Sequence, residues 1–143
     1  MSTEANKALV RRFIDAVING GQLDVTEQLL APGFAAHITG FPELDATAWR
    51  ETFRGFRAAF SDLRSTIEDL VAEGDRVAMR ATAEATHRGE LMGIPATGKR
   101  VQWVDFSIFR IADGKLAEEW MQMDMAGLMQ QLAGSATPAG RPA

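Results

Sequence analysis

The sequence of 143 residues contains no cysteine. Disulfide bonds, metal sites built on thiolates and a cysteine nucleophile are therefore excluded, and the redox compartment is left open. No apolar run approaches the ~20 residues that a membrane-spanning helix needs, and no signal-peptide pattern precedes the first predicted helix. A cytoplasmic protein that is not inserted in a membrane is the simplest interpretation.

Positive charge is also scarce. Fifteen lysines and arginines against nineteen acidic residues give a net charge of −4, and the basic residues are scattered along the chain. Such a chain offers no positive surface for a polyanion, so we expect no nucleic acid partner. The two histidines, His37 and His87, lie far apart and outside any metal-ligand spacing, so no metal site is predicted.

The residues that are present indicate one folded domain. A hydrophobic content of 46% is ordinary for a globular protein, and the length suits a single core. We expect this domain to span residues 1–133, with a flexible tail of small residues and proline at 134–143. Helical spacing predicts a helix from Ser2 or Thr3 to Asn19, and a capping box at Asp24 predicts a short second helix.

A third helix is predicted to open at Asp45 or Thr47 and to carry a stripe of aromatic residues. Core packing is the simpler explanation of that stripe, and it is compatible with lining a hollow core. The stripe consists of Trp49, Phe53, Phe56 and Phe60.

Strand patterns fill most of the second half of the chain. Residues 63–73 and 76–87 flank a tight turn at Gly74-Asp75, and residues 101–111 and 116–123 flank Asp113-Gly114, a strong two-residue hairpin signal. A last helix is predicted over residues 125–132. Helices followed by long antiparallel strands predict an α+β domain with its helices on one face of a curved sheet.

The register of the last hairpin decides which side chains share a face. If Ala112 pairs with Lys115, one face carries acids, indoles and a glutamine, in the pairs Trp103–Asp124, Asp105–Gln122, Ser107–Trp120 and Phe109–Glu118. The other face is apolar enough to be covered by a partner subunit, with Val104, Phe106, Ile108, Met121 and Met123. A β-bulge in the hairpin would exchange the faces of the residues beyond it.

Acids beside indoles suggest proton chemistry, because an apolar environment raises the pKa of a carboxyl group toward neutrality. Asp124 is the best placed, at the end of the final strand, but it is equally a good N-cap for the last helix, and spacing alone does not decide. A structural hydrogen bond is the favoured role for Asp105, and Glu118 and Glu119 are expected at a solvated rim.

Within the Gly/Pro-rich segment 88–99, residues 93–99 match the spacing of a phosphate-binding P-loop up to Lys99. Arg100, however, replaces the serine or threonine that binds magnesium, and a strand pattern follows instead of a helix. We therefore interpret the segment as a wide hairpin connection, from which Leu91, Met92 and Ile94 lean over the mouth of a pocket.

Four stretches together resemble one known family. They are Glu73-Gly-Asp-Arg-Val, Thr86-His-Arg-Gly-Glu-Leu-Met-Gly-Ile-Pro-Ala-Thr-Gly-Lys, Val104-Asp-Phe and Asp113-Gly-Lys-Leu-Ala-Glu-Glu-Trp-Met-Gln-Met-Asp. The chain is similar from about Asn6 to Leu132 to the SnoaL-like polyketide cyclases of the nuclear-transport-factor-2-like superfamily. The resemblance implies a cone, in which three N-terminal helices close over a curved antiparallel sheet and enclose a ligand pocket.

The resemblance also implies an activity. Members of this family close the last ring of an anthracycline precursor by intramolecular aldol condensation, without a metal or an organic cofactor. Asp124, which follows Trp120, matches the position of their catalytic aspartate, and this favours the catalytic role over the capping role. His37, His87 and Asp105 also lie at motif positions of the family, and Arg80 is a further candidate for the pocket.

Our hypothesis from the sequence is a cofactor-independent cyclase that acts on a small apolar polycyclic substrate. Asp124 shuttles the proton, and Trp49, Phe53, Trp103 and Trp120 form flat apolar walls. One alternative is a polyketide ring hydroxylase, or a partner of one, with the same pocket. The other is a non-catalytic domain that binds a small molecule. The apolar second face and the resemblance predict a homodimer or a higher homo-oligomer.

Overall fold

The computed structural model describes residues 2–134, so the predicted tail, apart from Gly134, lies outside the described residues. Helices and strands alternate in the first half of the chain, and long strands dominate the second. The elements are α1 (Thr3–Phe13), a π-helical turn (Ile14–Asn19), a 3-10 turn (Leu23–Val25), α2 (Thr26–Leu29), β1 (Leu30–Ile38), α3 (Ala46–Ala59), β2 (Arg64–Glu73), β3 (Arg76–Thr86), β4 (Arg100–Ala112), β5 (Lys115–Met123) and α4 (Met125–Ala133). No helix in this part of the chain is long and apolar enough to cross a membrane.

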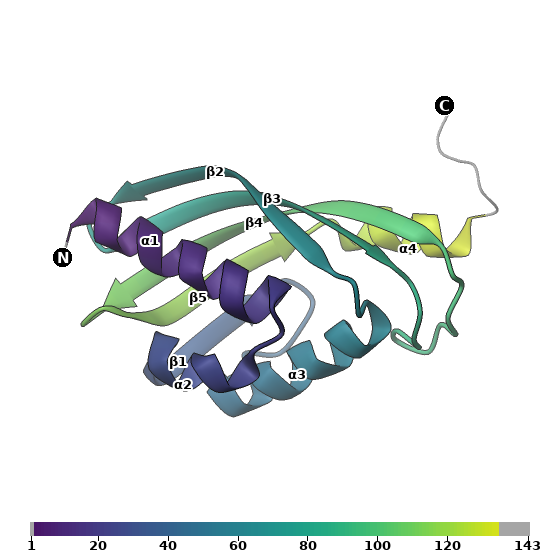
Figure 1. The fold of residues 1–143 in the computed structure, drawn as a ribbon, viewed down its shortest axis with the longest axis horizontal. Helices are drawn as coiled ribbons and strands as arrows, with labels where there is room; N and C mark the ends of the chain where they lie inside the picture. The colour runs from purple at the N-terminus through teal and green to yellow at the C-terminus, as the bar shows by residue number, and fades with distance from the viewer. Residues whose placement is uncertain (1, 135–143) are drawn as a thin grey trace.

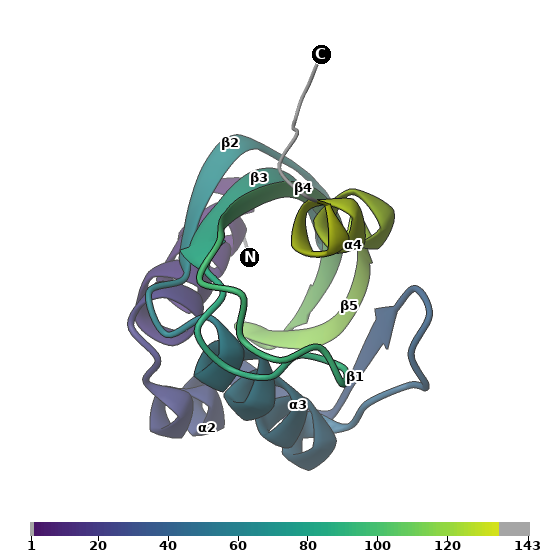
Figure 2. The same cartoon turned by 90° about the vertical axis from the view of Figure 1, so that its right-hand side faces the viewer.

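The five strands form one curved sheet in the order β1-β5-β4-β3-β2. The view in Figure 2 shows the sheet curling around an interior that α1 and α3 close from the opposite side, while α4 lies beside β4 at one end of the cone (Figure 1). The predicted α+β cone is therefore confirmed. The sheet is mixed rather than wholly antiparallel, because β1 pairs in parallel with β5.

The ends of the helices follow local hydrogen bonding. Ser2 accepts a hydrogen bond from the backbone N–H of Ala5 at 3.0 Å, and Asp45 accepts one from Ala48 at 2.8 Å, which confirms both predicted N-caps. The predicted capping box at Asp24 is wrong. Thr26 donates its hydroxyl back to the carbonyl of Leu23, and a 3-10 turn precedes α2.

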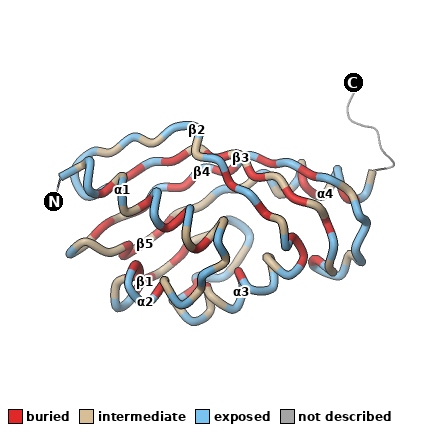
Figure 3. Tube along the Cα trace, viewed as in Figure 1, coloured by how far each residue is buried: buried red, intermediate tan, exposed pale blue. Residues whose placement is uncertain are grey.

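Strands β3 and β4 alternate between the interior and the outer face, as the burial colours in Figure 3 show. On β4 the inward residues are buried, whereas Val104, Phe106 and Ile108 are exposed on the outer face. Phe13 of α1 joins the sheet to α3, because its ring lies 6.1 Å from that of Phe109 and 5.5 Å from that of Trp49.

The β4–β5 hairpin contains a bulge that changes the predicted faces. The Asp113-Gly114 turn is confirmed, since Ala112 pairs with Lys115. Ile111 then pairs with Leu116 but Arg110 pairs with Glu118, so Ala117 is an extra residue on β5.

Beyond the bulge, Asp105 pairs with Met123 and Ser107 with Met121, so the predicted pairs Trp103–Asp124, Asp105–Gln122, Ser107–Trp120 and Phe109–Glu118 are wrong. Glu119, Met121 and Met123 line the interior instead, while Trp120 and Gln122 line a groove on the outer face.

Candidate active site

An apolar cavity of about 410 Å³ lies between the helices and the concave face of the sheet. Its size is in the usual range for a small-molecule site. Its lining comes from α1, the π-helical turn, α3, inward positions of all five strands, the segment after β3 and the start of α4. The side chains used below are Trp49, Glu51, Phe53, Phe56, Met79, Glu90, Leu91, Met92, Trp103, Asp105, Ser107, Glu119, Met121, Met123 and Met125.

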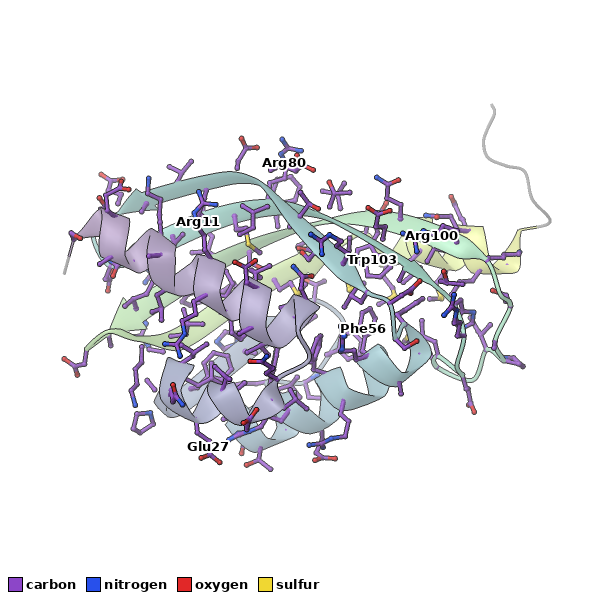
Figure 4. All side chains as sticks on the ribbon, in the orientation of Figure 1. Arg11, Glu27, Phe56, Arg80, Arg100 and Trp103 are labelled. Atoms are coloured by element: carbon purple, nitrogen blue, oxygen red, sulfur yellow. The ribbon has the colours of Figure 1, made fainter. Side chains whose placement is uncertain are left out.

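Aromatic rings form a large part of this lining. Trp49 and Phe53 of α3 stack with 5.1 Å between ring centroids and 14° between planes. Phe56 meets Trp103 of β4 edge to face, with centroids 5.7 Å apart, and Figure 4 labels this pair between α3 and the sheet. Flat rings on two sides of a cavity favour a flat apolar ligand.

Methionines make up much of the remaining lining. Five of the seven methionines line the cavity, namely Met79, Met92, Met121, Met123 and Met125. A thioether chain is unbranched and polarisable, so it adapts to the outline of a bound ligand. The cavity therefore combines rigid aromatic surfaces with adaptable ones.

Two carboxyl groups face this apolar space. Asp105 of β4 is 6% exposed and Glu119 of β5 is 4% exposed. Ser107, two residues beyond Asp105 on the same face, donates a hydrogen bond of 3.0 Å from its Oγ to Oε2 of Glu119. Asp105 and the hydrogen-bonded pair Ser107–Glu119 thus place buried polar side chains on the floor of the cavity that β4 and β5 provide.

Burial makes both carboxyl groups weak acids. Desolvation raises the pKa of Asp105 from 3.8 to about 7, opposed in part by a hydrogen bond that Asp105 accepts from the Trp103 side chain. Desolvation also raises the pKa of Glu119 from 4.5 to about 7; the Ser107 hydrogen bond lowers it and the charge of Asp105 adds to the rise. With pKa values near 7, each of the two carboxyl groups can gain or lose a proton near neutral pH.

All charged side chains along this cavity are acidic. Glu51 and Glu90 are exposed, whereas Asp105 and Glu119 are buried, and no lysine, arginine or histidine of the described residues joins the lining. A ligand with a carboxylate or phosphate would meet repulsion and no compensating cation. The cavity therefore suits a neutral ligand.

The structure brings together four of the residues proposed from the sequence: Trp49, Phe53, Trp103 and Asp105 all line the cavity. His87 lies elsewhere. It is fully buried beside Phe60, with 5.6 Å between ring centroids, and its Nδ1 accepts a hydrogen bond from the backbone N–H of Thr97 at 3.2 Å.

Three further candidates, His37, Trp120 and Arg80, line a separate groove on the outer face of the sheet. His37 stacks on Trp120 at 5.4 Å and donates a 2.6 Å hydrogen bond from Nε2 to Glu118. Arg80 pairs with Asp69 at 2.7 Å and projects away from the helices in Figure 4. The β5 bulge explains the position of Trp120, because it turns this indole outward.

Asp124 lies at the N-terminus of α4, where its Oδ1 accepts a 2.9 Å hydrogen bond from the backbone N–H of Gly127. Its side chain is exposed and does not line the cavity. The capping role is therefore visible in the structure.

Sequence reasoning missed Glu119 and Ser107 as site residues, and the expectation that Glu119 lies at a solvated rim is wrong. The adjacent pair Glu118-Glu119 always places one acid on each face of the strand, so the signal was present. The register error assigned the inward position to Glu118. Glu118 instead faces His37 and Arg110, which hold the pKa of its carboxyl below the usual value.

The fold and the cavity define an α+β cone of the nuclear-transport-factor-2-like class, with a pocket for a small apolar ligand and two carboxyl groups able to exchange protons. The comparison with known proteins narrows this class. The chain belongs to the SnoaL-like polyketide cyclase family, whose family model matches residues 8–132.

Relatives of known name support this membership. The aklanonic acid methyl ester cyclase DnrD of Streptomyces peucetius is 32% identical over 139 residues, which cover 92% of each chain. The crystal structure of AclR from Streptomyces galilaeus, for which a hydroxylase activity has been suggested, is 33% identical with a TM-score of 0.84 and covers 92% of this chain and 97% of AclR.

The crystal structure of a candidate SnoaL-like polyketide cyclase from Jannaschia sp. CCS1 superposes on this chain with a TM-score of 0.87 at 23% identity. It covers 94% of this chain and 95% of its own and shows the shared fold.

Proposed function

We propose that this protein closes a ring of a neutral, anthracycline-like polyketide ester by intramolecular aldol condensation. The observation that carries the proposal is the buried pair Asp105 and Glu119 in an apolar cavity that lacks cationic side chains. The activity named for DnrD, a relative that matches over nearly its whole length, supports the substrate class.

The reaction needs one acid and one base, and the pair supplies both. The ionised carboxylate removes a proton from the carbon next to a carbonyl group, and the resulting enolate carbon attacks a second carbonyl carbon of the same substrate. The protonated carboxyl group then donates its proton to the new alkoxide oxygen. One carbon–carbon bond forms, one proton moves from carbon to oxygen, and no atom is lost. Proton exchange within the pair or with solvent restores the starting state.

The cavity contributes by orientation and by charge selection. Flat walls such as Trp49–Phe53 and Trp103 hold the polycyclic part of the substrate, so that the reacting carbons meet within one molecule. Because all charged residues of the lining are acidic, an esterified substrate is favoured over the corresponding free acid.

Asp124 is the competing candidate for the proton-transferring group. Its position in the sequence supports this role through the family resemblance, whereas its exposure and its hydrogen bond to Gly127 support a cap. We favour the buried pair, because raised pKa values near 7 suit proton transfer at neutral pH and because both groups line the cavity, whereas Asp124 does not.

The experiment compares three variants, D105N, E119Q and D124N, with aklanonic acid methyl ester as substrate and product quantified by liquid chromatography with mass detection. We expect D105N and E119Q to lower kcat by about 10²–10⁴-fold and D124N to retain most of the activity. Wild-type turnover in both D105N and E119Q, with loss in D124N, would transfer the role to Asp124.

The similarity to AclR makes ring hydroxylation the second candidate function. The same assay separates the two reactions, because an aldol closure leaves the substrate mass unchanged and a hydroxylation adds one oxygen atom. Binding without any product, unaffected by E119Q, would instead indicate a binding domain.

A homodimer is the second part of this proposal. The outer face of the sheet exposes large apolar side chains, among them Val71 (65% exposed), Phe106 (55%) and Ile108 (44%). An apolar groove beside them contains Trp120 and His37. Apolar patches of this kind mark interaction surfaces, and a second copy of the chain would cover them.

A further inference from the structure

The segment between β3 and β4 has a tight two-residue turn at its tip, beside the cavity. Leu91 and Ile94 exchange two backbone hydrogen bonds of 2.9 and 2.8 Å, and Met92 and Gly93 form the turn between them. Both turn residues have positive φ, 50° at Met92 and 85° at Gly93. This is the backbone of a type I′ turn, which favours asparagine or aspartate followed by glycine.

Methionine is an unfavourable residue for the first position of this turn. Within residues 2–134, Met92 and Asp113 are the two non-glycine residues with positive φ, and both precede a glycine in a hairpin turn. Aspartate is a residue type that tolerates this conformation, because a short polar side chain is able to hydrogen-bond to the local backbone. Met92 has no such compensation, so its presence indicates a role for the side chain itself.

The side chain of Met92 lies at the mouth of the cavity. It is 62% exposed and yet it lines the cavity together with its neighbours Glu90 and Leu91. Leu91 is 7% exposed and fixes the turn against the body of the domain. An exposed apolar chain beside an apolar cavity gains burial when a ligand enters.

The base of the segment is firmly attached. The backbone N–H of His87 donates a hydrogen bond to the carbonyl of Lys99 at 2.9 Å, and the carbonyl of His87 accepts one from the N–H of Gly98 at 2.8 Å. The backbone N–H of Thr97 donates a third hydrogen bond to the His87 ring. Arg88 donates its backbone N–H to Ala59 at the end of α3, at 2.9 Å. These hydrogen bonds anchor the base of the segment to the domain, and Met92 at its tip lines the cavity.

We propose that Met92 contacts bound substrate and selects for flat apolar ligands by covering their exposed face. Only the identity of the substrate rests on the cyclase function proposed above. The unfavourable backbone conformation at Met92 is retained because the thioether side chain supplies this contact.

The test uses variants that separate backbone strain from side-chain contact. Met92→Asn creates the favoured Asn-Gly turn and removes the apolar chain, whereas Met92→Leu keeps apolar bulk and strain. Asp113→Asn is the matched control, since it changes the equivalent position of a type I′ turn that is remote from the cavity lining. The probe is 1,8-dihydroxyanthraquinone, whose binding quenches the fluorescence of Trp49 and Trp103.

We expect M92N to raise Tm by roughly 2–4 °C and to weaken anthraquinone binding about five- to tenfold. M92L and D113N should bind the probe as the wild type does. Wild-type affinity of M92N, or a lower Tm of M92N, would overturn the proposal, as would absence of anthraquinone binding by the wild type. Weaker binding by M92N with no turnover of the ester by the wild type would refute the cyclase function and leave the role of Met92 intact.

Discussion

Replacing Glu119 by glutamine tests the chemistry of the site and the stability of the fold together. Glu119 is 4% exposed and lines the same cavity as Asp105. Glutamine has the same shape and its carbonyl oxygen can still accept the hydrogen bond from Ser107. The substitution therefore removes the acid–base group and the buried charge and leaves the packing in place.

The expected gain in stability follows from the pKa. The difference between the ordinary value of 4.5 and the value of about 7 in the folded protein corresponds to roughly 3 kcal/mol, at about 1.4 kcal/mol per pKa unit. The folded state holds its proton more tightly than the unfolded state. Its advantage is complete below about pH 4 and is lost as the pH rises through about 7. At pH 8 the wild type carries the full cost of a buried carboxylate, and E119Q does not.

Urea denaturation followed by tryptophan fluorescence at pH 4, 6 and 8 measures this effect, with turnover assayed in parallel at pH 8. We expect E119Q to exceed the wild type in unfolding free energy by up to roughly 3 kcal/mol at pH 8 and to match it at pH 4. We also expect its kcat to fall by about 10²–10⁴-fold. A substitution that stabilises the protein and also inactivates it is typical of a buried catalytic acid.

Glu118→Gln is the control, because Glu118 is the adjacent residue on the same strand and faces outward. The hydrogen bond from His37 lowers the pKa of Glu118, so its ionised form helps the fold above its ordinary pKa and that help is lost toward low pH. E118Q should not gain stability at pH 8 and should keep its turnover. Parallel pH profiles of wild type and E119Q, or an equal gain in E118Q, would refute the reasoning from burial.

Three further predictions concern other parts of the molecule. Ser107→Ala removes the hydrogen bond that favours the ionised form of Glu119, so the acidic limb of the kcat–pH profile should move to higher pH; an unchanged profile would separate Ser107 from the chemistry. Asp124→Ala should cost about 1 kcal/mol in urea denaturation through the lost N-cap of α4, and D124N should cost nothing measurable. Phe106→Glu, on the outer face, should convert the proposed dimer to a monomer by light scattering at unchanged Tm, and an unchanged mass would place any interface elsewhere.

Local signals in the sequence predicted most of the elements of this fold. The caps at Ser2 and Asp45 and the turn at Asp113-Gly114 each depend on a few neighbouring residues, and each was found. The strand β1 was missed because Pro32-Gly33 interrupts its pattern and its pairing with β5 joins residues about 80 positions apart. Local patterns contain no information on a parallel pairing of that length.

The site was predicted only in part, for a different reason. Residue types and alternation identified Trp103 and Asp105 as neighbours on one face of β4, and the structure confirms that both line the cavity. Placement of the β5 residues required the register of the whole hairpin. A bulge has no reliable signature in a single sequence, since it depends on how the sheet curves around its core.

The bulge at Ala117 also explains how one strand can carry two separate functions. Before the bulge, β5 follows the register set by the Asp113-Gly114 turn. After it, each side chain faces the side opposite to the one that this register predicts. The shift places Glu119 in the apolar interior, where its pKa rises, and Glu118 beside His37 and Arg110, where its pKa falls. It also turns Met121 and Met123 toward the cavity and Trp120 toward the outer groove. The extra residue therefore places two adjacent acids on opposite faces of the sheet, one in the cavity, where we propose that it transfers protons, and the other in ion pairs on the outer surface.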